Sequence, residues 1–208
     1  MVTLDLTSFG TNPSIGDISQ ALSDASVSCM EVDRVVVAQS VTLPDYAFTG
    51  WTYLGSVDNL DTCVAIGSSA FAYTGIGLGD YRVTVDIGNC SMIGEWAFDS
   101  CGGLQNISLA SGITIPEGCF DNCGSLSNVV NLNHVVSIGV GAFFGCWCLT
   151  SVDLGDCRFL GHNAFTNCTG ISEVTLCPNG TTQSNEARAP PPPPLSLCSS
   201  AHTVTTEA

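Results

Sequence analysis

The pattern of apolar and polar residues along the chain repeats at a nearly fixed period. A phenylalanine preceded by alanine or, once, by cysteine recurs six times, at intervals of 23, 27, 22, 23 and 22 residues. The six phenylalanines, which we expect to anchor the core, are Phe48, Phe71, Phe98, Phe120, Phe143 and Phe165. Apolar residues also recur five and eleven positions before each of them, and in all copies but one six positions after. Because independent columns keep fixed offsets from one anchor, we interpret the pattern as an internal repeat.

Each copy is expected to contain a short strand, a glycine-rich turn and a segment that ends in the aromatic anchor. In Val85-Asp86-Ile87 the apolar residues alternate with an acidic one, which is typical of a strand with one buried face. One unit cannot bury its own apolar side, but stacked units form a continuous core. The pattern therefore predicts a solenoid of about seven coils. Parallel β-strands form a curved sheet on one face, and turns and short helical segments form the other.

The positions of the sheet that face solvent are expected to be small and polar. We assign them to Val36, Asn59, Asp86, Ser108, Asn131, Asp153 and Thr175. This column lacks the Trp, Tyr and Arg residues that dominate interaction hot spots. It also lacks a regular threonine ladder, which argues against an ice-binding surface.

The most regular copy reads Ile-Gly-x-x-Ala-Phe-x-x-Cys-x-x-Leu-x-x-Val-x-Leu at residues 138–154, and a variant follows at 160–176. This motif resembles the BspA-type (treponemal) leucine-rich repeats over about residues 33–177. Two copies depart from it, with Thr74 in the cysteine position and Cys119 in the alanine position. The resemblance implies a leucine-rich-repeat solenoid, usually extracellular or surface-displayed and used for adhesion and protein contacts. It implies no enzyme activity and carries over no catalytic residue.

Three regions are expected. Residues 1–32 form an N-terminal cap with a short capping helix, which begins at Ser14 and has an early acid at Asp17. Residues 33–177 form the repeats, and residues 178–208 form a polar, proline-rich C-terminal tail. The tail contains a run expected to adopt polyproline II and to serve modification or assembly. This run is Pro190, Pro191, Pro192, Pro193 and Pro194.

Charge and hydropathy narrow the classes of partner. Of 208 residues, nineteen are acidic and four are arginine, with no lysine, for a net charge of −15. Four scattered arginines cannot form a basic patch, so nucleic acid and anionic membranes are not expected partners. A mean hydropathy of +0.33 argues against disorder for most of the chain. The chain has no apolar run long enough for a membrane span, and its first residues do not resemble a signal peptide.

Position sorts eleven of the twelve cysteines into two groups, and the twelfth, Cys119, takes the alanine position before Phe120. Four share one column and are expected to be a buried ladder of thiols, namely Cys101, Cys123, Cys146 and Cys168. The disulfide candidates are Cys29, Cys63, Cys90, Cys148, Cys157, Cys177 and Cys198. Cys63 and Cys90 share a column in adjacent coils, a spacing that disulfide geometry accepts. Cys157 would need Cys148 or Cys177 as its partner, whereas Cys29 and Cys198 could tie the ends of the chain to the solenoid or to neighbours.

Motifs for cofactors and catalysis are lacking. Without a Cys-x-x-Cys pair, a zinc site is not expected, and no cofactor is implied. Aspartates at 86, 153 and 156 could contribute to a calcium site, but a solvated acidic face explains them better. No nucleophile elbow, P-loop, dinucleotide fingerprint or zinc-protease motif is present. Four glycosylation sequons begin at Asn89, Asn106, Asn167 and Asn179.

Two functions remain, and both are non-enzymatic and extracellular or at the cell surface. In the first, the protein assembles with itself into a filament or surface layer through its solenoid ends and its proline-rich tail. In the second, it is an adhesin or ligand-recognition module that uses the solenoid face. The expected partners are accordingly copies of itself, or other surface proteins and glycans.

Overall fold

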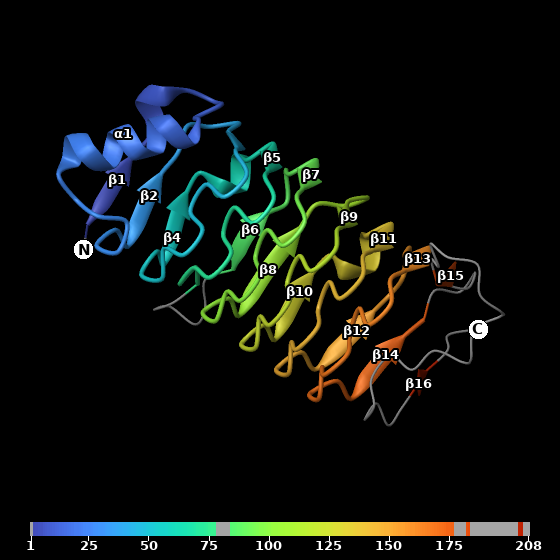
Figure 1. The fold of residues 1–208 in the computed structure, drawn as a ribbon. Coiled ribbons are helices and arrows are strands. Elements are labelled where there is room, and N and C mark those ends of the chain that lie inside the picture. The colour runs from blue at the N-terminus through green and yellow to red at the C-terminus, as the bar shows by residue number, and fades with distance from the viewer. Residues whose placement is uncertain (1, 78–83, 177–181, 184–203, 206–208) are drawn as a thin grey trace.

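The computed structural model describes residues 2–77, 84–176, 182–183 and 204–205, the last two pairs by their backbone alone. In this part of the chain the polypeptide winds as a solenoid that advances from the N-terminal to the C-terminal end (Figure 1). The expected parallel-stranded leucine-rich-repeat solenoid is confirmed.

A first line of short parallel strands runs along one side of the solenoid (Figure 1). Apolar side chains at the middle of most of these strands face the core, as the alternation in the sequence predicts. The strands are β1 (Thr3–Asp5), β2 (Arg34–Val36), β4 (Ser56–Asp58), β6 (Val85–Ile87), β8 (Asn106–Leu109), β10 (Asn128–Val130), β12 (Ser151–Asp153), β14 (Glu173–Thr175) and β16 (Val204–Thr205).

A second line of strands, not expected from the sequence, forms another side (Figure 1). Each strand is only two residues long, and in the coils with described side chains its second residue is buried. These strands are β3 (Thr42–Leu43), β5 (Ala65–Ile66), β7 (Met92–Ile93), β9 (Thr114–Ile115), β11 (Ser137–Ile138), β13 (Phe159–Leu160) and β15 (Thr182–Gln183). The solenoid therefore has sheet on two sides.

The third side is a stack of turns centred on the phenylalanine anchors, which we call the Phe turns. In the turn around Phe98, three backbone N–H groups donate to carbonyls of the next coil. Trp96 donates to Glu117 at 3.0 Å, Phe98 to Cys119 at 2.9 Å and Ser100 to Asp121 at 2.7 Å. Positions two before and two after the anchor have a left-handed backbone, with φ of 60° at Trp96 and 55° at Ser100. This conformation costs an L-residue about 1–2 kcal/mol, which the bonds between coils offset.

The six phenylalanines are buried and stack along the axis. The four ring pairs from Phe71 to Phe165 have centroids 5.1–5.5 Å apart and interplanar angles of 3–18°. Phe48 is tilted by 32° against Phe71 and meets Trp51 edge-on at 5.1 Å. Such pairs contribute about 0.5–1.5 kcal/mol each beyond the area they bury. The stack forms the centre of the hydrophobic core.

The N-terminal region adds a strand and a helix to the first coil. Helix α1 (Ile15–Ala25) begins after Ser14, whose Oγ accepts from the backbone N–H of Asp17 at 3.1 Å. Oδ2 of Asp17 in turn accepts from the backbone N–H of Ser14 at 2.7 Å, which completes a capping box. Ile18 and Ala21 of the helix are buried in the same core, and the helix contacts β1. A 3₁₀ turn, η1 (Thr7–Phe9), lies between β1 and the helix.

Strand pairing is interrupted at different places in the two lines. Among the described strands of the first line, pairing stops between β4 and β6 and between β10 and β12. In the second line it stops between β7 and β9. Two further 3₁₀ turns, η2 (Leu60–Thr62) and η3 (Leu132–His134), follow β4 and β10 respectively. Both interruptions of the first line therefore coincide with an inserted turn.

Part of the expected tail extends the solenoid. Backbone pairing places β15 beside β13 and β16 beside β14, both in parallel. Residues 178–208 thus contribute one strand to each line. The proline run at 190–194, together with Cys177, Asn179 and Cys198, lies outside the described residues. Within the described part of the chain, no helix combines the length and the apolar character needed to cross a bilayer.

Candidate functional site

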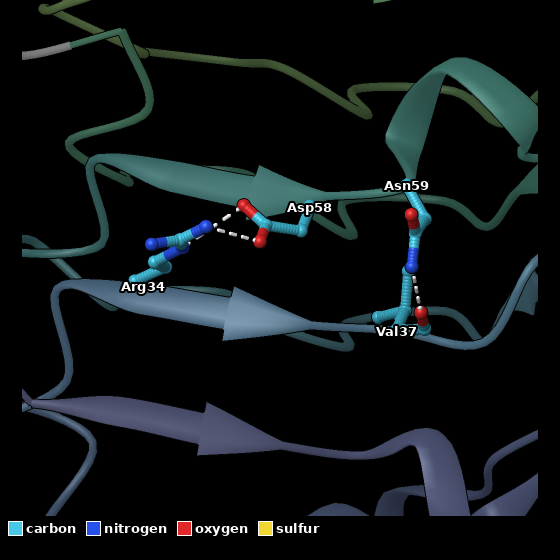
Figure 2. A network of polar contacts seen from close by, with 4 residues as sticks. All are labelled: Arg34, Val37, Asp58 and Asn59. Carbon is cyan, nitrogen blue, oxygen red and sulfur yellow. Dashed lines mark hydrogen bonds and ion pairs between the residues drawn. The ribbon is translucent and has the colours of Figure 1, made fainter.

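The outward face of the first line of strands carries an ion pair between neighbouring coils. Nε of Arg34 on β2 donates to Oδ1 of Asp58 on β4 at 3.0 Å, and Nη2 contacts the other carboxylate oxygen (Figure 2). Hydrogen bonding and the negative charge of Asp58 raise the pKa of Arg34 above its ordinary value. Because both side chains are partly exposed, the ion pair contributes little to the stability of the fold and mainly holds the two side chains in place relative to each other.

Asn59 does not lie in the outward column of the sheet, where the sequence had placed it. The strands pair Val36 with Asp58, so Asp58 occupies that position. Asn59 is an extra residue with a left-handed backbone, φ 66°. Its side-chain Nδ2 donates to the carbonyl of Val37 in the preceding coil at 2.7 Å (Figure 2). The assignment of Asn59 was therefore wrong, and its insertion accounts for the 23-residue interval of this coil.

Asn131 repeats this arrangement in the other 23-residue coil, and its assignment was wrong for the same reason. Ser108 pairs with Val130, and Asn131 follows with φ 65°. Its Nδ2 donates to the carbonyl of Leu109 at 2.9 Å. The asparagine amide thus continues the hydrogen bonding between coils at the point where the backbone leaves the strand.

A polar hollow of about 200 Å³ lies beside Asn131, where pairing stops between β10 and β12. The turn η3 contacts β12 at this interruption. The polar side chains that line the hollow are Ser127, Asn128, Asn131, Asn133, Ser151 and Asp153. These amides, hydroxyls and one carboxylate are able to hydrogen-bond a small polar molecule or water.

The three aspartates considered for calcium are engaged locally. Oδ1 of Asp86 accepts from the backbone N–H of Gly88 at 2.8 Å, and Oδ1 of Asp153 accepts from Gly155 at 3.0 Å. Asp156 lies 3.2 Å from Nδ1 of His134. In the described ranges, no group of three or more His, Cys, Asp or Glu side chains could hold a metal ion.

Two tryptophans lie over one coil on the Phe-turn side, the coil that contains Phe120. A β-carbon at Gly118 would lie 2.2 Å from the ring of Trp96, which comes from the preceding coil. A β-carbon at Gly124 would lie 2.1 Å from the ring of Trp147, which comes from the following coil. Each indole therefore rests directly on a glycine that leaves it room. Trp147 is nevertheless 54% exposed.

Two carboxylates belong to the Phe turns of two neighbouring coils. Asp99 and Asp121 occupy the same position in neighbouring Phe turns, one residue after the anchor. Asp99 is only 9% exposed and accepts from Oγ of Ser100 at 2.9 Å. Oδ1 of Asp121 is buried without a hydrogen-bond partner. Burial and the adjacent charge of Asp99 raise the pKa of Asp121 above its ordinary value.

Tyr73 completes this group on the coil before Asp99. Its side chain is 56% exposed, and the negative charge of Asp99 raises its pKa. We call Tyr73, Trp96, Asp99, Asp121 and Trp147 the aromatic–acidic patch. Partly exposed aromatic side chains of this kind are suited to contacts with a partner.

The four cysteines of the expected ladder are fully buried and link successive coils. Each thiol donates to the carbonyl of the phenylalanine in the preceding coil, at 2.9–3.1 Å. Cys119 is also buried, and burial raises the pKa of its thiol. These groups are hydrogen-bond donors inside the core and are poorly placed to act as nucleophiles.

The disulfide candidates differ in burial. Cys63 and Cys90 are buried free thiols in adjacent coils, and Sγ of Cys63 lies 3.2 Å from the carbonyl oxygen of Val41. Cys157 is buried and donates to the carbonyl of Phe159 at 3.2 Å. Cys148 is exposed and Cys29 partly exposed. A disulfide between Cys63 and Cys90 stays a prediction.

The three sequon asparagines within the described residues also differ. Asn89 is exposed, but its Nδ2, the atom to which a glycan would be attached, donates to the carbonyl of Asp61 at 2.6 Å. Asn106 is half-buried in β8, whereas Asn167 is exposed in a Phe turn. Asn167 is therefore the most accessible of the three, and modification at each sequon stays a prediction.

Sequence reasoning missed the aromatic–acidic patch. Its five residues come from four coils and occupy four different offsets from the anchor, so no single column of the repeat contains them. The available signal was the pair of glycines at 118 and 124, which leaves the middle coil bare where Trp96 and Trp147 approach it.

Comparisons with known proteins agree with this architecture. The profile of the BspA type leucine rich repeat region matches in six copies, over residues 23–114 and 83–187. The chain is similar to a leucine-rich repeat protein from Bacteroides ovatus ATCC 8483, with a TM-score of 0.56 and 22% identity over 74% of this chain and 45% of that one.

A leucine rich cell surface protein from Faecalibacterium prausnitzii A2-165 gives a TM-score of 0.40 and 18% identity, over 86% of this chain and 61% of that one. The chain therefore spans less than two thirds of either solved protein. No curated protein matches it. With the family profile covering most of its coils, the chain belongs to the BspA-type leucine-rich repeat family.

Proposed function

We propose that this protein is an extracellular or surface-displayed adhesion module that binds a protein partner through the Phe-turn side of its solenoid. The observation that carries the proposal is the aromatic–acidic patch, in which Trp96 and Trp147 lie over the coil that contains Asp121. Tryptophan and tyrosine are enriched in interface hot spots because they bury a large area and lose little side-chain entropy. The leucine-rich-repeat solenoid is typically a non-enzymatic fold, and we assign this chain no catalytic activity.

The patch is better suited to this role than the outward sheet face. The sheet face is polar, its charged pair is satisfied internally, and its hollow is small. The patch combines the exposed rings of Tyr73 and Trp147 with the carboxylates of two neighbouring Phe turns. Helix α1 covers part of the N-terminal end of the core, which further favours binding along the side of the solenoid.

Surface plasmon resonance with matched variants tests this assignment. The immobilised full-length protein is exposed to the surface-protein fraction of the cells that make it, beside a Trp96→Ala/Trp147→Ala variant. An Asn128→Ala/Ser151→Ala variant alters the sheet face and is the control. We expect saturable binding that the tryptophan variant loses and the control keeps. Binding lost only in the control would place the site at the sheet hollow and contradict the proposal.

Self-assembly is a second candidate, favoured by the backbone pairing of β15 and β16 with the last coils. A strand that pairs with a sheet edge through its backbone is also able to pair with the edge of a second copy. We expect full-length protein to form regular fibres in negative-stain electron microscopy and a truncation after Cys177 to form none. Fibres from the truncated chain would exclude the tail as the linking element.

A further inference from the structure

We infer that the polar hollow beside Asn131 binds one uncharged sugar residue, either free or at the end of a glycan. The inference goes beyond the proposed function, because the hollow is lined by residues of β10, η3 and β12 and by none of the Phe turns. Four observations carry it, namely a gap in the strand pairing, unbonded polar groups in that gap, its size and its charge.

The hollow lies where the hydrogen bonding between coils is interrupted. At two intact junctions a backbone bond leads into the strand, from Ser127 to Gln105 and from Ser172 to Thr150, each at 2.9 Å. Among the described residues, no such bond joins Thr150 to Ser127, and β12 does not pair with β10. Asn131, the inserted residue of this coil, lies at the same junction. The strands on either side of the hollow therefore leave room for a ligand.

Polar side chains in the gap are free to bond such a ligand. In the described part of the chain, the side chains of Asn128, Asn133 and Ser151 make no hydrogen bond, although all three line the hollow. Asn128 and Ser151 are also exposed. Asp153 keeps acceptor capacity, because its one printed bond, from the N–H of Gly155 at 3.0 Å, leaves further lone pairs on the carboxylate. Amides and hydroxyls both donate and accept, which matches the neighbouring hydroxyl groups of a sugar.

The size of the hollow matches a single sugar ring. Its volume of about 200 Å³ is several times that of one water molecule and lies below the range of about 300–1,000 Å³ that holds drug-sized ligands. Val129 and Leu132 line it beside the polar groups, so the C–H face of a sugar ring is able to pack against apolar atoms. The hollow is thus too small for a protein surface but large enough for one six-membered ring.

The charge of the hollow and of the molecule favours an uncharged ligand. Asp153 lines the hollow, and the chain has a net charge of −15, so phosphates and sulfated or carboxylated sugars are repelled. A metal cation is a poorer candidate, because in the described ranges no three acidic, histidine or cysteine side chains converge. A neutral molecule rich in hydroxyl groups fits both conditions.

Saturation-transfer difference NMR with the full-length protein tests the inference. The probes are the methyl glycosides of glucose, galactose, mannose and N-acetylglucosamine, titrated separately to give dissociation constants. Tetrahydropyran-2-methanol keeps the ring but has one hydroxyl, and methyl glucuronide adds a negative charge. The protein variants are Asn128→Ala and Ser151→Ala, with Ser108→Ala as the matched control, since Ser108 lies on β8, which pairs on both sides. Near-ultraviolet circular dichroism verifies that each variant is folded.

We expect at least one neutral glycoside to bind saturably, with a dissociation constant in the millimolar range. Asn128→Ala and Ser151→Ala should each weaken its binding about three- to tenfold, because each removes one hydrogen bond, and Ser108→Ala should leave it unchanged. Tetrahydropyran-2-methanol and methyl glucuronide should bind more weakly. A trisaccharide that ends in the bound sugar separates the two sources. Affinity at least equal to that of the methyl glycoside supports the end of a glycan, and loss of binding supports a free sugar.

No saturable binding of any of the four glycosides would overturn the inference and leave the hollow to water. Equal binding of tetrahydropyran-2-methanol, or a loss in Ser108→Ala as large as that in Ser151→Ala, would overturn it as well. The Trp96→Ala/Trp147→Ala variant separates this test from that of the proposed function, because it should bind the sugar as the wild type does. A failure to bind sugar therefore leaves the protein-binding role of the Phe-turn side unaffected.

Discussion

Removing one ring from the phenylalanine stack should cost more in the middle than at its end. Phe143 stacks on Phe120 at 5.1 Å and 18°, and on Phe165 at 5.1 Å and 3°. Phe165 has a single ring partner in the described stack. Both side chains are buried, so replacement by alanine leaves a cavity in each case.

The structure sets the size of the difference. A buried Phe→Ala substitution destabilises by about 3–5 kcal/mol through lost transfer energy and the residual cavity. Each stacked pair adds about 0.5–1.5 kcal/mol beyond the buried area. Phe143→Ala removes two pairs and Phe165→Ala removes one, so the first should exceed the second by about 0.5–1.5 kcal/mol. Phe143→Leu keeps most of the volume and should cost less than Phe143→Ala because the cavity is smaller.

Urea unfolding followed by far-ultraviolet circular dichroism measures these differences. A solenoid couples each coil to its neighbours alone, so the slope of the transition must be compared between variants before midpoints are converted into free energies. Urea midpoints of the variants equal to that of the wild type would show that these rings do not stabilise the core. A larger loss for Phe165→Ala than for Phe143→Ala would refute stacking as the source of the difference.

Three further outcomes are expected. Asn131→Ala should lower the free energy of unfolding in urea by about 1–3 kcal/mol, because it removes the bond to Leu109 and leaves an alanine in a left-handed backbone. Asn131→Gly should lower it less, and an equal loss in both variants would show that backbone conformation does not matter there. Because the pKa of Asp121 is raised in the folded state, its ionised form destabilises the fold above that pKa, and this destabilisation disappears as pH falls through the pKa. Asp121→Asn should therefore raise the thermal unfolding midpoint at neutral pH and not at acid pH. A difference that does not depend on pH would contradict this reasoning. Thiol alkylation with mass spectrometry should detect a Cys63–Cys90 disulfide after the native protein is exposed to a low-molecular-weight disulfide oxidant. A Cys63→Ser variant is the control. If both thiols are fully alkylated when the oxidised sample is unfolded, no disulfide has formed and the prediction is wrong.

The periodic columns allow the central core to be predicted from the sequence, and the reason is physical. Phe98 and Phe120 must occupy equivalent places in successive coils because each coil buries its apolar side on the next. The second line of strands escaped prediction because a pair such as Thr42–Leu43 is too short to show a strand pattern. It becomes a strand only through its partner 23 residues later.

The residues of the site were predictable to a smaller extent. Asn59 and Asn131 were misplaced because counting back from the anchor cannot reveal which residue of a longer coil is the inserted one. The left-handed positions were hidden by their variable occupants, such as Tyr46 and Trp96, since L-residues rarely adopt that conformation. The aromatic–acidic patch depends on contacts between coils, which no single copy of the repeat contains.

The interruptions in the two lines of strands have a mechanical consequence. The first line is interrupted after β4 and after β10, whereas the second line is interrupted after β7, so the two never break between the same pair of coils. Because the interruptions are offset, at least one of the two sheets is continuous across every junction between the first and last phenylalanine-bearing coils. The backbone bonds of the Phe turns also cross each of these junctions. Tension along the axis therefore meets no plane of weakness. A solenoid built in this way can transmit force along its axis from coil to coil.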